Sequence, residues 1–145
     1  MNSYEMAEDY LKRAERCLGE AENAFKENDY PMAIRRSQEC VELSIKGILR
    51  AVSIEFPREH DVSEVLISAP WEKIGSPTWF VDQVGEMARI MQEITPKRGP
   101  AMYGFEREMK PANVIFSLED GQKATREAKF VYEICGKFLK QWGAL

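Results

Sequence analysis

Basic side chains that could hold a phosphate group gather in one stretch of the sequence, residues 89–110. Arginine offers paired N–H donors to a phosphate, and the glycines at 99 and 104 would let backbone amides approach an anion. The stretch has a charge of +2, whereas the whole chain has −4 and its remainder therefore −6. Its basic residues are Arg89, Lys97, Arg98, Arg107 and Lys110, and its acids are Glu93, Glu106 and Glu108. We therefore expect a local anion site.

We predict that this site joins the basic stretch to the polar face of an earlier helix. Tyr103 could stack on a nucleotide base. The alternative is that Arg98 and Arg107 tie the stretch to acids on neighbouring helices and bind no ligand. The predicted ligand contacts are Lys97, Arg98, Tyr103, Arg107, Lys46 and Arg50.

The sequence offers little for catalysis or metal binding. His60 is the only histidine, and Cys17, Cys40 and Cys135 stand alone without a CxxC pair. We expect the cysteines to be reduced core residues. The phosphate-loop, dinucleotide, zinc-protease and serine-hydrolase motifs are all missing. We therefore predict no catalytic residue, no metal and no cofactor, and we interpret His60 as a helix-entry or packing residue.

Composition and charge restrict the class of protein further. A chain of 145 residues with 44% hydrophobic and 30% charged residues is typical of one globular domain, here residues 1–145. A net charge of −4 argues against a surface that tracks DNA. No apolar run approaches the roughly 18 residues that cross a bilayer, and the N-terminus lacks a signal-peptide layout. We expect a cytoplasmic protein that binds no membrane.

Apolar residues repeat at helical spacing over residues 4–27 and 31–53, which predicts two long helices joined by a turn. The second helix also carries a seam of small residues, and alanines at 7, 14 and 21 of the first helix match it. A tight antiparallel hairpin should result. The seam consists of Ala33, Ser37, Cys40, Ser44, Gly47 and Ala51. A polar strip on the same helix is either a solvated face or an anion-binding one.

The remaining chain predicts further helices. A short helix over residues 61–69 ends before Pro70, a long one covers 78–94, and Ser117 caps a last helix that runs nearly to the C-terminus. Residues 96–116 hold three prolines and two glycines and should form an irregular loop. The expected fold class is all-α, an antiparallel up-and-down bundle of four long helices plus one short helix.

Motifs along nearly the whole chain resemble the HEPN family of helical bundles. Residues 29–33 read Asp-Tyr-Pro-Met-Ala, and glutamine, glutamate and lysine follow at four-residue steps, at 38, 42 and 46. His60-Asp61 is similar to the family's opening of its short third helix. Residues 98–106 resemble an Arg-x-x-Ala-x-Tyr-Gly-Asp/Glu segment of prokaryotic members. The resemblance implies a homodimer, nucleotide binding and a small nucleotidyltransferase partner, in a toxin–antitoxin-like pair.

Some HEPN proteins are ribonucleases that use an Arg-x4-6-His motif. No arginine stands five to seven positions before His60, and tyrosine replaces the histidine in the segment led by Arg98. We therefore predict a non-catalytic module that dimerises and binds a nucleotide or another phosphate-bearing ligand. The alternatives are a pure protein-interaction module without a ligand and a ribonuclease with an altered active site that uses Arg98 and Tyr103.

Large apolar residues near helix ends and loops exceed what four antiparallel helices need. We expect a second copy of the chain to cover some of them, because an exposed apolar surface marks an interface and a two-fold dimer is the commonest closed assembly. These residues are Trp71, Trp79, Phe80, Trp142 and Leu145.

Overall fold

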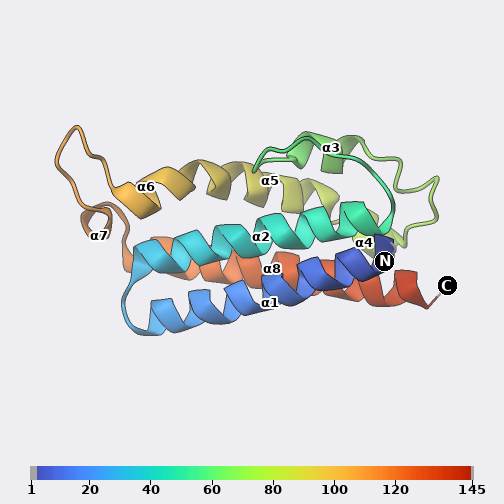
Figure 1. The fold of residues 1–145 in the computed structure, drawn as a ribbon, viewed down its shortest axis with the longest axis horizontal. Coiled ribbons are helices and arrows are strands. Elements are labelled where there is room, and N and C mark those ends of the chain that lie inside the picture. The colour runs from blue at the N-terminus through green and yellow to red at the C-terminus, as the bar shows by residue number, and fades with distance from the viewer. Residues whose placement is uncertain (1–2, 145) are drawn as a thin grey trace.

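The computed structural model describes residues 3–144 and shows an all-α bundle (Figure 1). Helices α1 and α2 run antiparallel, α8 lies behind them, and α5 lies above α2 in this view. The predicted fold class is confirmed: four long helices and the short α3 are present. Their bounds are α1 Ser3–Lys26, α2 Tyr30–Ala51, α3 Ser63–Ser68, α5 Val84–Ile94 and α8 Leu118–Gly143.

The turn between α1 and α2 follows from its residue types. Asn28 adopts a left-handed conformation with φ of 62°, and Asp29 accepts a hydrogen bond of 3.2 Å from the amide of Met32. Pro31 lies in the first turn of α2, where its missing N–H leaves no helical bond unmade. Both predicted helices agree with the structure within two residues.

Small residues bring α1 and α2 into close contact, as the seam predicts. A Cβ atom added at Gly47 would lie 2.5 Å from Cδ2 of Leu11 on α1. A side chain at position 47 would therefore displace the Leu11 side chain and crowd Tyr10, whose Cβ would lie 3.1 Å away. The facing alanines of α1 are fully buried: Ala7, Ala14 and Ala21.

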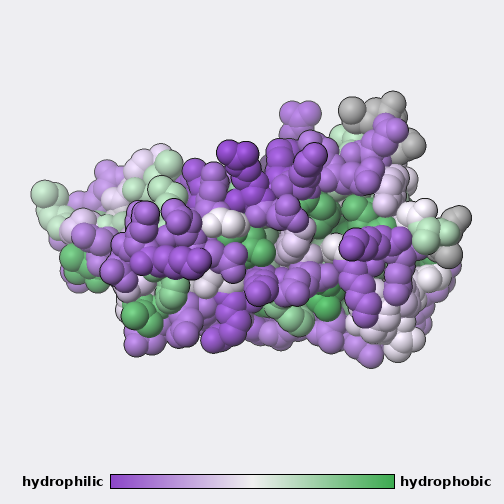
Figure 2. Space-filling view, turned by 90° about the horizontal axis from the view of Figure 1, so that it is seen from below, coloured by the Kyte–Doolittle hydropathy of each residue, from purple (hydrophilic) through white to green (hydrophobic). Residues whose placement is uncertain are grey.

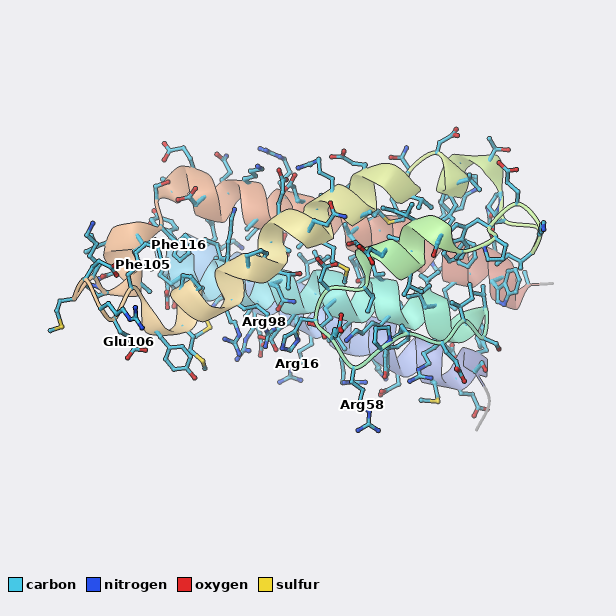
Figure 3. The ribbon with its side chains drawn as sticks, turned by 90° about the horizontal axis from the view of Figure 1, so that it is seen from above. Arg16, Arg58, Arg98, Phe105, Glu106 and Phe116 are labelled. Atoms are coloured by element: carbon cyan, nitrogen blue, oxygen red, sulfur yellow. The ribbon has the colours of Figure 1, made fainter. Side chains whose placement is uncertain are left out.

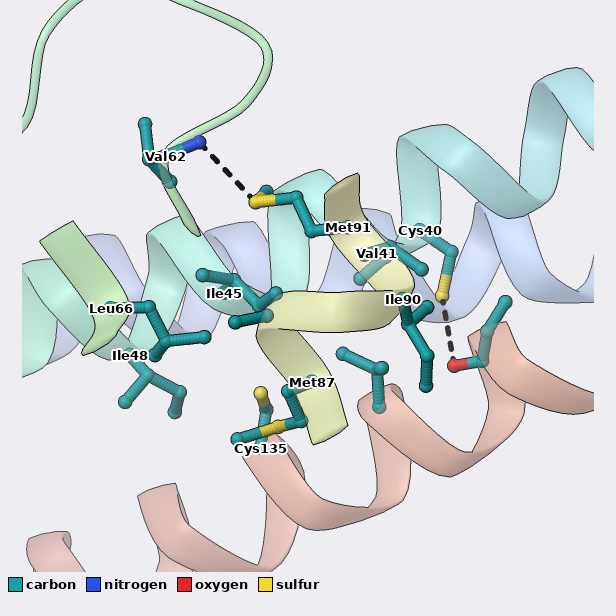
Figure 4. Packing of buried hydrophobic residues seen from close by; sticks show 14 of the residues in the cluster. Cys40, Val41, Ile45, Ile48, Val62, Leu66, Met87, Ile90, Met91 and Cys135 are labelled. Atoms are coloured by element: carbon teal, nitrogen blue, oxygen red, sulfur yellow. Dashed lines mark hydrogen bonds between the residues drawn. The ribbon is translucent and has the colours of Figure 1, made fainter. Parts of the chain in front are cut away.

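Helix α5 fills the space between α2 and α8 (Figure 4). Cys40 and Cys135 are buried in this core as predicted, whereas Cys17 is only partly buried. Burial raises the pKa of the Cys40 thiol to about 12, so it stays protonated and unreactive. The largest fully buried side chains of α5 are Met87, Ile90 and Met91.

The expectation that large aromatics near the helix ends form a dimer face is wrong for two of them. Trp71 and Phe80 are buried within the chain, where both rings pack on Phe138 of α8. The Trp71 indole donates a hydrogen bond of 2.7 Å to the carbonyl of Leu66. Segment 69–80, which contains both residues, folds back over the end of the bundle and covers it. Trp79 and Trp142 are partly buried, and Leu145 lies outside the described residues.

The predicted helix 78–94 is divided in two. Helix α4 (Thr78–Val81) ends in a turn, and α5 begins at Val84. The amide of Gln83 donates a hydrogen bond of 2.9 Å to the carbonyl of Phe80, three residues earlier. This spacing is that of a 3-10 turn and not of an α-helix. This break sets α4 apart from α5 and directs Phe80 into the core.

The stretch 96–116 is the irregular loop that its prolines and glycines predict only in part, chiefly over residues 104–111. The short 3-10 helix η1 (Thr95–Lys97) and α6 (Arg98–Tyr103) continue the line of α5, and α7 (Ala112–Ile115) follows (Figure 1). Pro96 and Pro100 fall in first turns, where proline is tolerated. Between residues 3 and 144, no helix is long and apolar enough to cross a membrane.

Candidate functional site

Three polar side chains on successive turns of α2 form the base of the site. Gln38 is only 1% exposed, although it is polar. Its amide nitrogen donates to Glu42 Oε1 at 2.9 Å, and the Lys46 ammonium donates to Glu42 Oε2 at 2.8 Å. The four-residue spacing places all three on one helix face. Glu42 is thus the centre of a polar network.

Two residues that are distant in sequence complete this network. The Nδ1 atom of His60 lies 3.1 Å from Glu42 Oε1. The Arg98 guanidinium donates to Oε1 of Gln38 and lies 3.9 Å from the same Glu42 oxygen. We call these five residues the Glu42 cluster: Gln38, Glu42, Lys46, His60 and Arg98.

Helix α6 delivers Arg98 to this position. Arg98 is the first residue of α6, and the Arg35 guanidinium of α2 donates to its carbonyl at 3.4 Å. Figure 3 shows Arg98 beside α2, towards the middle of the molecule. The helical path of residues 95–103, which the sequence did not reveal, therefore builds the cluster.

The cluster keeps Glu42 ionised. Partial burial raises the pKa of Glu42, but the hydrogen bonds from Lys46 and Gln38 and the charges of Lys46 and His60 outweigh it. The pKa of this carboxyl consequently lies below its ordinary value. One carboxylate then faces two permanent cations, so the cluster carries an excess of positive charge.

His60 contacts Glu42 through Nδ1 although much of its side chain is exposed. The side chain is 58% exposed. A carboxylate can only accept a hydrogen bond, so Nδ1 carries the hydrogen of this contact. His60 stands three residues before α3 and contacts Glu42 of α2, so its interpretation as a helix-entry or packing residue stays a prediction. The amide of Ser63 at the start of α3 donates its hydrogen bond to the Asp61 carboxylate, at 2.9 Å.

Arg50 is close to the cluster but packs on an aromatic ring. Its guanidinium carbon lies 4.6 Å from the centre of the Phe56 ring, and Lys46 Nζ lies 5.5 Å from it. Lys46 also donates to the carbonyl of Glu59 at 2.5 Å. Both cations thereby hold the loop that carries His60.

The six predicted ligand contacts do not all meet. Lys46 and Arg98 share Glu42 as a neighbour, and Arg50 lies one turn beyond Lys46. Tyr103 is 64% exposed and follows Arg98 by five residues, which places it about 140° around α6. Lys97 and Arg107 make no recorded contact with the cluster. Figure 3 shows Phe105, two residues after Tyr103, at the end of the molecule.

The sequence reasoning missed the role of Gln38, Glu42 and His60. The motif search looked only for an arginine before His60. The arginine that shares Glu42 with His60 is Arg98, which stands 38 positions after it. The sequence feature that could have indicated the site is the four-residue spacing of Gln38, Glu42 and Lys46, which places them on one helix face. Among residues 3–144, no three His, Cys, Asp or Glu side chains are placed to hold a metal ion.

Comparison with known proteins defines the class to which this fold and cluster belong. The family model for the HEPN domain matches residues 7–139, so the chain belongs to the HEPN family. Among individual relatives, a protein of Methanocaldococcus jannaschii named "Putative toxin MJ1304" is 29% identical over 135 residues. The match covers 91% of this chain and 87% of that protein.

Two crystal structures show the same fold. ST0689, an archaeal HEPN homologue, is 25% identical with a TM-score of 0.63, over 92% of this chain and 97% of that one. TT1696 from Thermus thermophilus is 22% identical with a TM-score of 0.67, over 94% of this chain and 98% of that one. Both overlays extend along nearly the whole bundle.

Proposed function

We propose that this HEPN protein binds a phosphate-bearing ligand, a nucleotide or an RNA, at the Glu42 cluster. The observation that supports the proposal is the convergence of Lys46, His60 and Arg98 on one carboxylate. Such an arrangement holds cations in fixed positions, and one carboxylate does not neutralise them. A protein with a net charge of −4 gains a local anion site in this way.

Arg98 is the principal contact in this proposal. Among residues 3–144, Arg98 finds an acceptor only for Nη1, which donates to Gln38, so the rest of the guanidinium fork can meet a phosphate. The side chain is 20% exposed and is held by the almost fully buried Gln38. A pre-positioned donor loses less conformational entropy when the ligand binds. Lys46 adds a second positive charge. In this proposal Lys97, Tyr103 and Arg107 do not contact the phosphate directly.

Titration with a fluorescent adenine nucleotide and with a short RNA tests the ligand site. The Arg98→Ala variant should bind at least tenfold more weakly than wild type, a loss of about 1.4 kcal/mol. Arg107→Ala is the matched control, because it removes an exposed arginine away from the cluster, and it should bind as wild type does. Equal affinities of the wild type and Arg98→Ala would overturn the assignment.

A second candidate function is RNA cleavage. It is favoured by the imidazole of His60, whose Nδ1 lies 3.1 Å from Glu42 Oε1, the same oxygen that Arg98 Nη1 approaches to 3.9 Å. Nε2 could remove the proton of a ribose 2′-hydroxyl, whose oxygen then attacks the adjacent phosphorus while the P–O5′ bond breaks and a 2′,3′-cyclic phosphate forms. The departing 5′-oxygen takes a proton from water, and Arg98 stabilises the phosphate charge. The name of the Methanocaldococcus jannaschii relative, a putative toxin, agrees with such an activity.

An RNA cleavage assay separates this candidate from binding alone. If the protein is a ribonuclease, His60→Ala abolishes cleavage and Tyr103→Phe leaves it unchanged. If the protein only binds, the wild type releases no cleavage product while the nucleotide titration still succeeds. Cleavage that survives His60→Ala would contradict the candidate.

The homodimer and the nucleotidyltransferase partner belong to the same proposal and rest on family membership. We propose a toxin–antitoxin-like pair, in which the partner controls access to the Glu42 cluster. Light scattering at tens of micromolar tests the dimer, and a mass of one chain would contradict it. A cytoplasmic location remains an expectation from the sequence.

A further inference from the structure

The side chain of Gln38 lies between the carboxylate of Glu42 and the guanidinium of Arg98. Its amide nitrogen donates to Glu42 Oε1 at 2.9 Å, and its carbonyl oxygen accepts from Arg98 Nη1. The chemistry dictates this orientation, because a carboxylate can only accept a hydrogen bond and a guanidinium can only donate one. Gln38 is 1% exposed, so the bridge is closed to water. A neutral group thus separates an anion from a cation.

The carboxylate oxygen of Glu42 that faces Arg98 already has two donors. Oε1 lies 2.9 Å from the Gln38 amide nitrogen and 3.1 Å from His60 Nδ1, and a carboxylate oxygen has two lone pairs. Lys46 donates to the other oxygen at 2.8 Å. Arg98 Nη1 stays 3.9 Å from Oε1. Since a direct charge-assisted hydrogen bond measures roughly 2.8 Å, a movement of about 1 Å would close this gap.

A direct pair between Glu42 and Arg98 would be stronger than an ion pair on the surface. Hydrophilic side chains predominate on the face of the bundle shown in Figure 2, and such exposed charges are well screened by water. The Arg13–Asp9 pair of α1, at 2.8 Å, has side chains that are 53% and 63% exposed. Those of Arg98 and Glu42 are only 20% and 17% exposed. Both ions are already withdrawn from water, so closing the gap would add little further desolvation.

The backbone of Arg98 is anchored independently of Gln38. The Arg35 guanidinium of α2 donates to the Arg98 carbonyl at 3.4 Å. Loss of the Gln38 amide would therefore leave the Arg98 side chain beside α2, next to a Glu42 oxygen that has lost one donor. Arg98 would then donate directly to that oxygen. The resulting pair would cancel the positive charge that a phosphate needs.

We propose that Gln38 is a positioning residue for phosphate binding, which keeps Arg98 and Glu42 apart so that the guanidinium retains its charge for the ligand. The inference rests on the proposed function, because it requires that Arg98 contacts phosphate. Glutamine suits this role, since its amide has a donor and an acceptor but no charge. A carboxylate at position 38 would itself neutralise Arg98, and an apolar side chain would let Glu42 do so.

A double-mutant cycle on nucleotide affinity tests the proposal. Gln38→Leu should bind the fluorescent adenine nucleotide at least tenfold more weakly than wild type, because Arg98 then pairs with Glu42. Glu42→Gln should tighten binding at least threefold more in the Gln38→Leu background than in wild type. A general loss of structure would not be repaired in this way. Gln92→Leu is the matched control, because that amide donates to Ser63 and not to Glu42, and its affinity should equal that of wild type.

Gln38→Met is measured in parallel, because it keeps the unbranched shape of glutamine, and circular dichroism shows whether each variant is folded. Equal affinities of wild type and Gln38→Leu would overturn the inference, as would equal effects of Glu42→Gln in the two backgrounds. Unfolding of both Gln38 variants would assign the residue to stability and would also overturn it. A wild type that binds neither nucleotide nor RNA would instead overturn the proposed function, and this inference with it.

Discussion

Two strips of helix α2 differ in what constrains their residues. Along the seam, Ser37, Cys40, Ser44 and Gly47 are fully enclosed against neighbouring helices, so their size is what matters. Along the Glu42 cluster, a carboxylate collects cations from other segments of the chain. The seam serves stability, and we propose that the cluster serves binding. A change of volume should therefore damage the first, and a change of charge the second.

The largest effect should come from adding volume to the seam. Gly47→Leu places a side chain where even a Cβ would be 2.5 Å from Leu11, so the free energy of unfolding should fall by about 3 kcal/mol. Gly19→Leu is the control, because position 19 of α1 is exposed and has no neighbour within 4 Å. Urea denaturation should show the control at least as stable as wild type. Equal losses at both sites would contradict the packing role of the seam.

A smaller loss should follow when the centre of the cluster is removed. Glu42→Ala takes away the shared acceptor of Gln38 and Lys46, and we expect about 2 kcal/mol less stability in urea denaturation. The exposed pair Asp9–Arg13 has the same four-residue spacing. Asp9→Ala should cost less than about 0.5 kcal/mol. A loss for Glu42→Ala as small as this would mean that the cluster is only a solvated surface.

The contribution of Glu42 should also depend on pH. Its pKa is lowered in the folded state, so the stabilisation is complete above the ordinary carboxyl value of 4.5 and is lost as the pH falls through the lower folded value. The difference in unfolding free energy between wild type and Glu42→Gln should therefore shrink below pH 4.5. Urea denaturation at a series of pH values measures this difference in unfolding free energy. A difference that grew as the pH fell would contradict the predicted direction.

The smallest effect is expected within the seam itself. The buried hydroxyl of Ser37 has no hydrogen-bond partner in the described structure. Ser37→Ala removes this hydroxyl without changing the volume much, so stability should stay equal or rise by up to about 1 kcal/mol. Ser117→Ala is the matched control, since that hydroxyl caps α8, and it should lose about 1 kcal/mol. The melting temperature of Ser37→Ala should equal or exceed that of wild type, whereas that of Ser117→Ala should be lower.

The contrast between the two strips also explains which parts of the structure the sequence predicted. Residues of the seam recur at helical steps and face a partner helix with matching alanines, so periodicity alone located them. The bundle and its long helices followed from the same pattern. By contrast, segment 69–80 covers the bundle end with Trp71 and Phe80, and no local period encodes that path.

The Glu42 cluster, too, could be predicted from the sequence only in part. Gln38, Glu42 and Lys46 lie on one helix face by spacing alone, but the arrival of His60 and Arg98 depends on how two connecting segments fold. Prolines at 96 and 100 indicated a loop, whereas the chain uses them to begin helical turns. Pro96 and Pro100 thus help to place Arg98 on α2.

The central claim is that the Glu42 cluster binds phosphate, and NMR titration tests it most directly. Adenine nucleotide is added to 15N-labelled protein while the Gln38 side-chain amide and the His60 ring nitrogens are observed. Both signals should move with the same dissociation constant, and the amides of residues 105–110 should stay in place. Shifts confined to residues 105–110, or none at the cluster in the presence of bound nucleotide, would contradict the account.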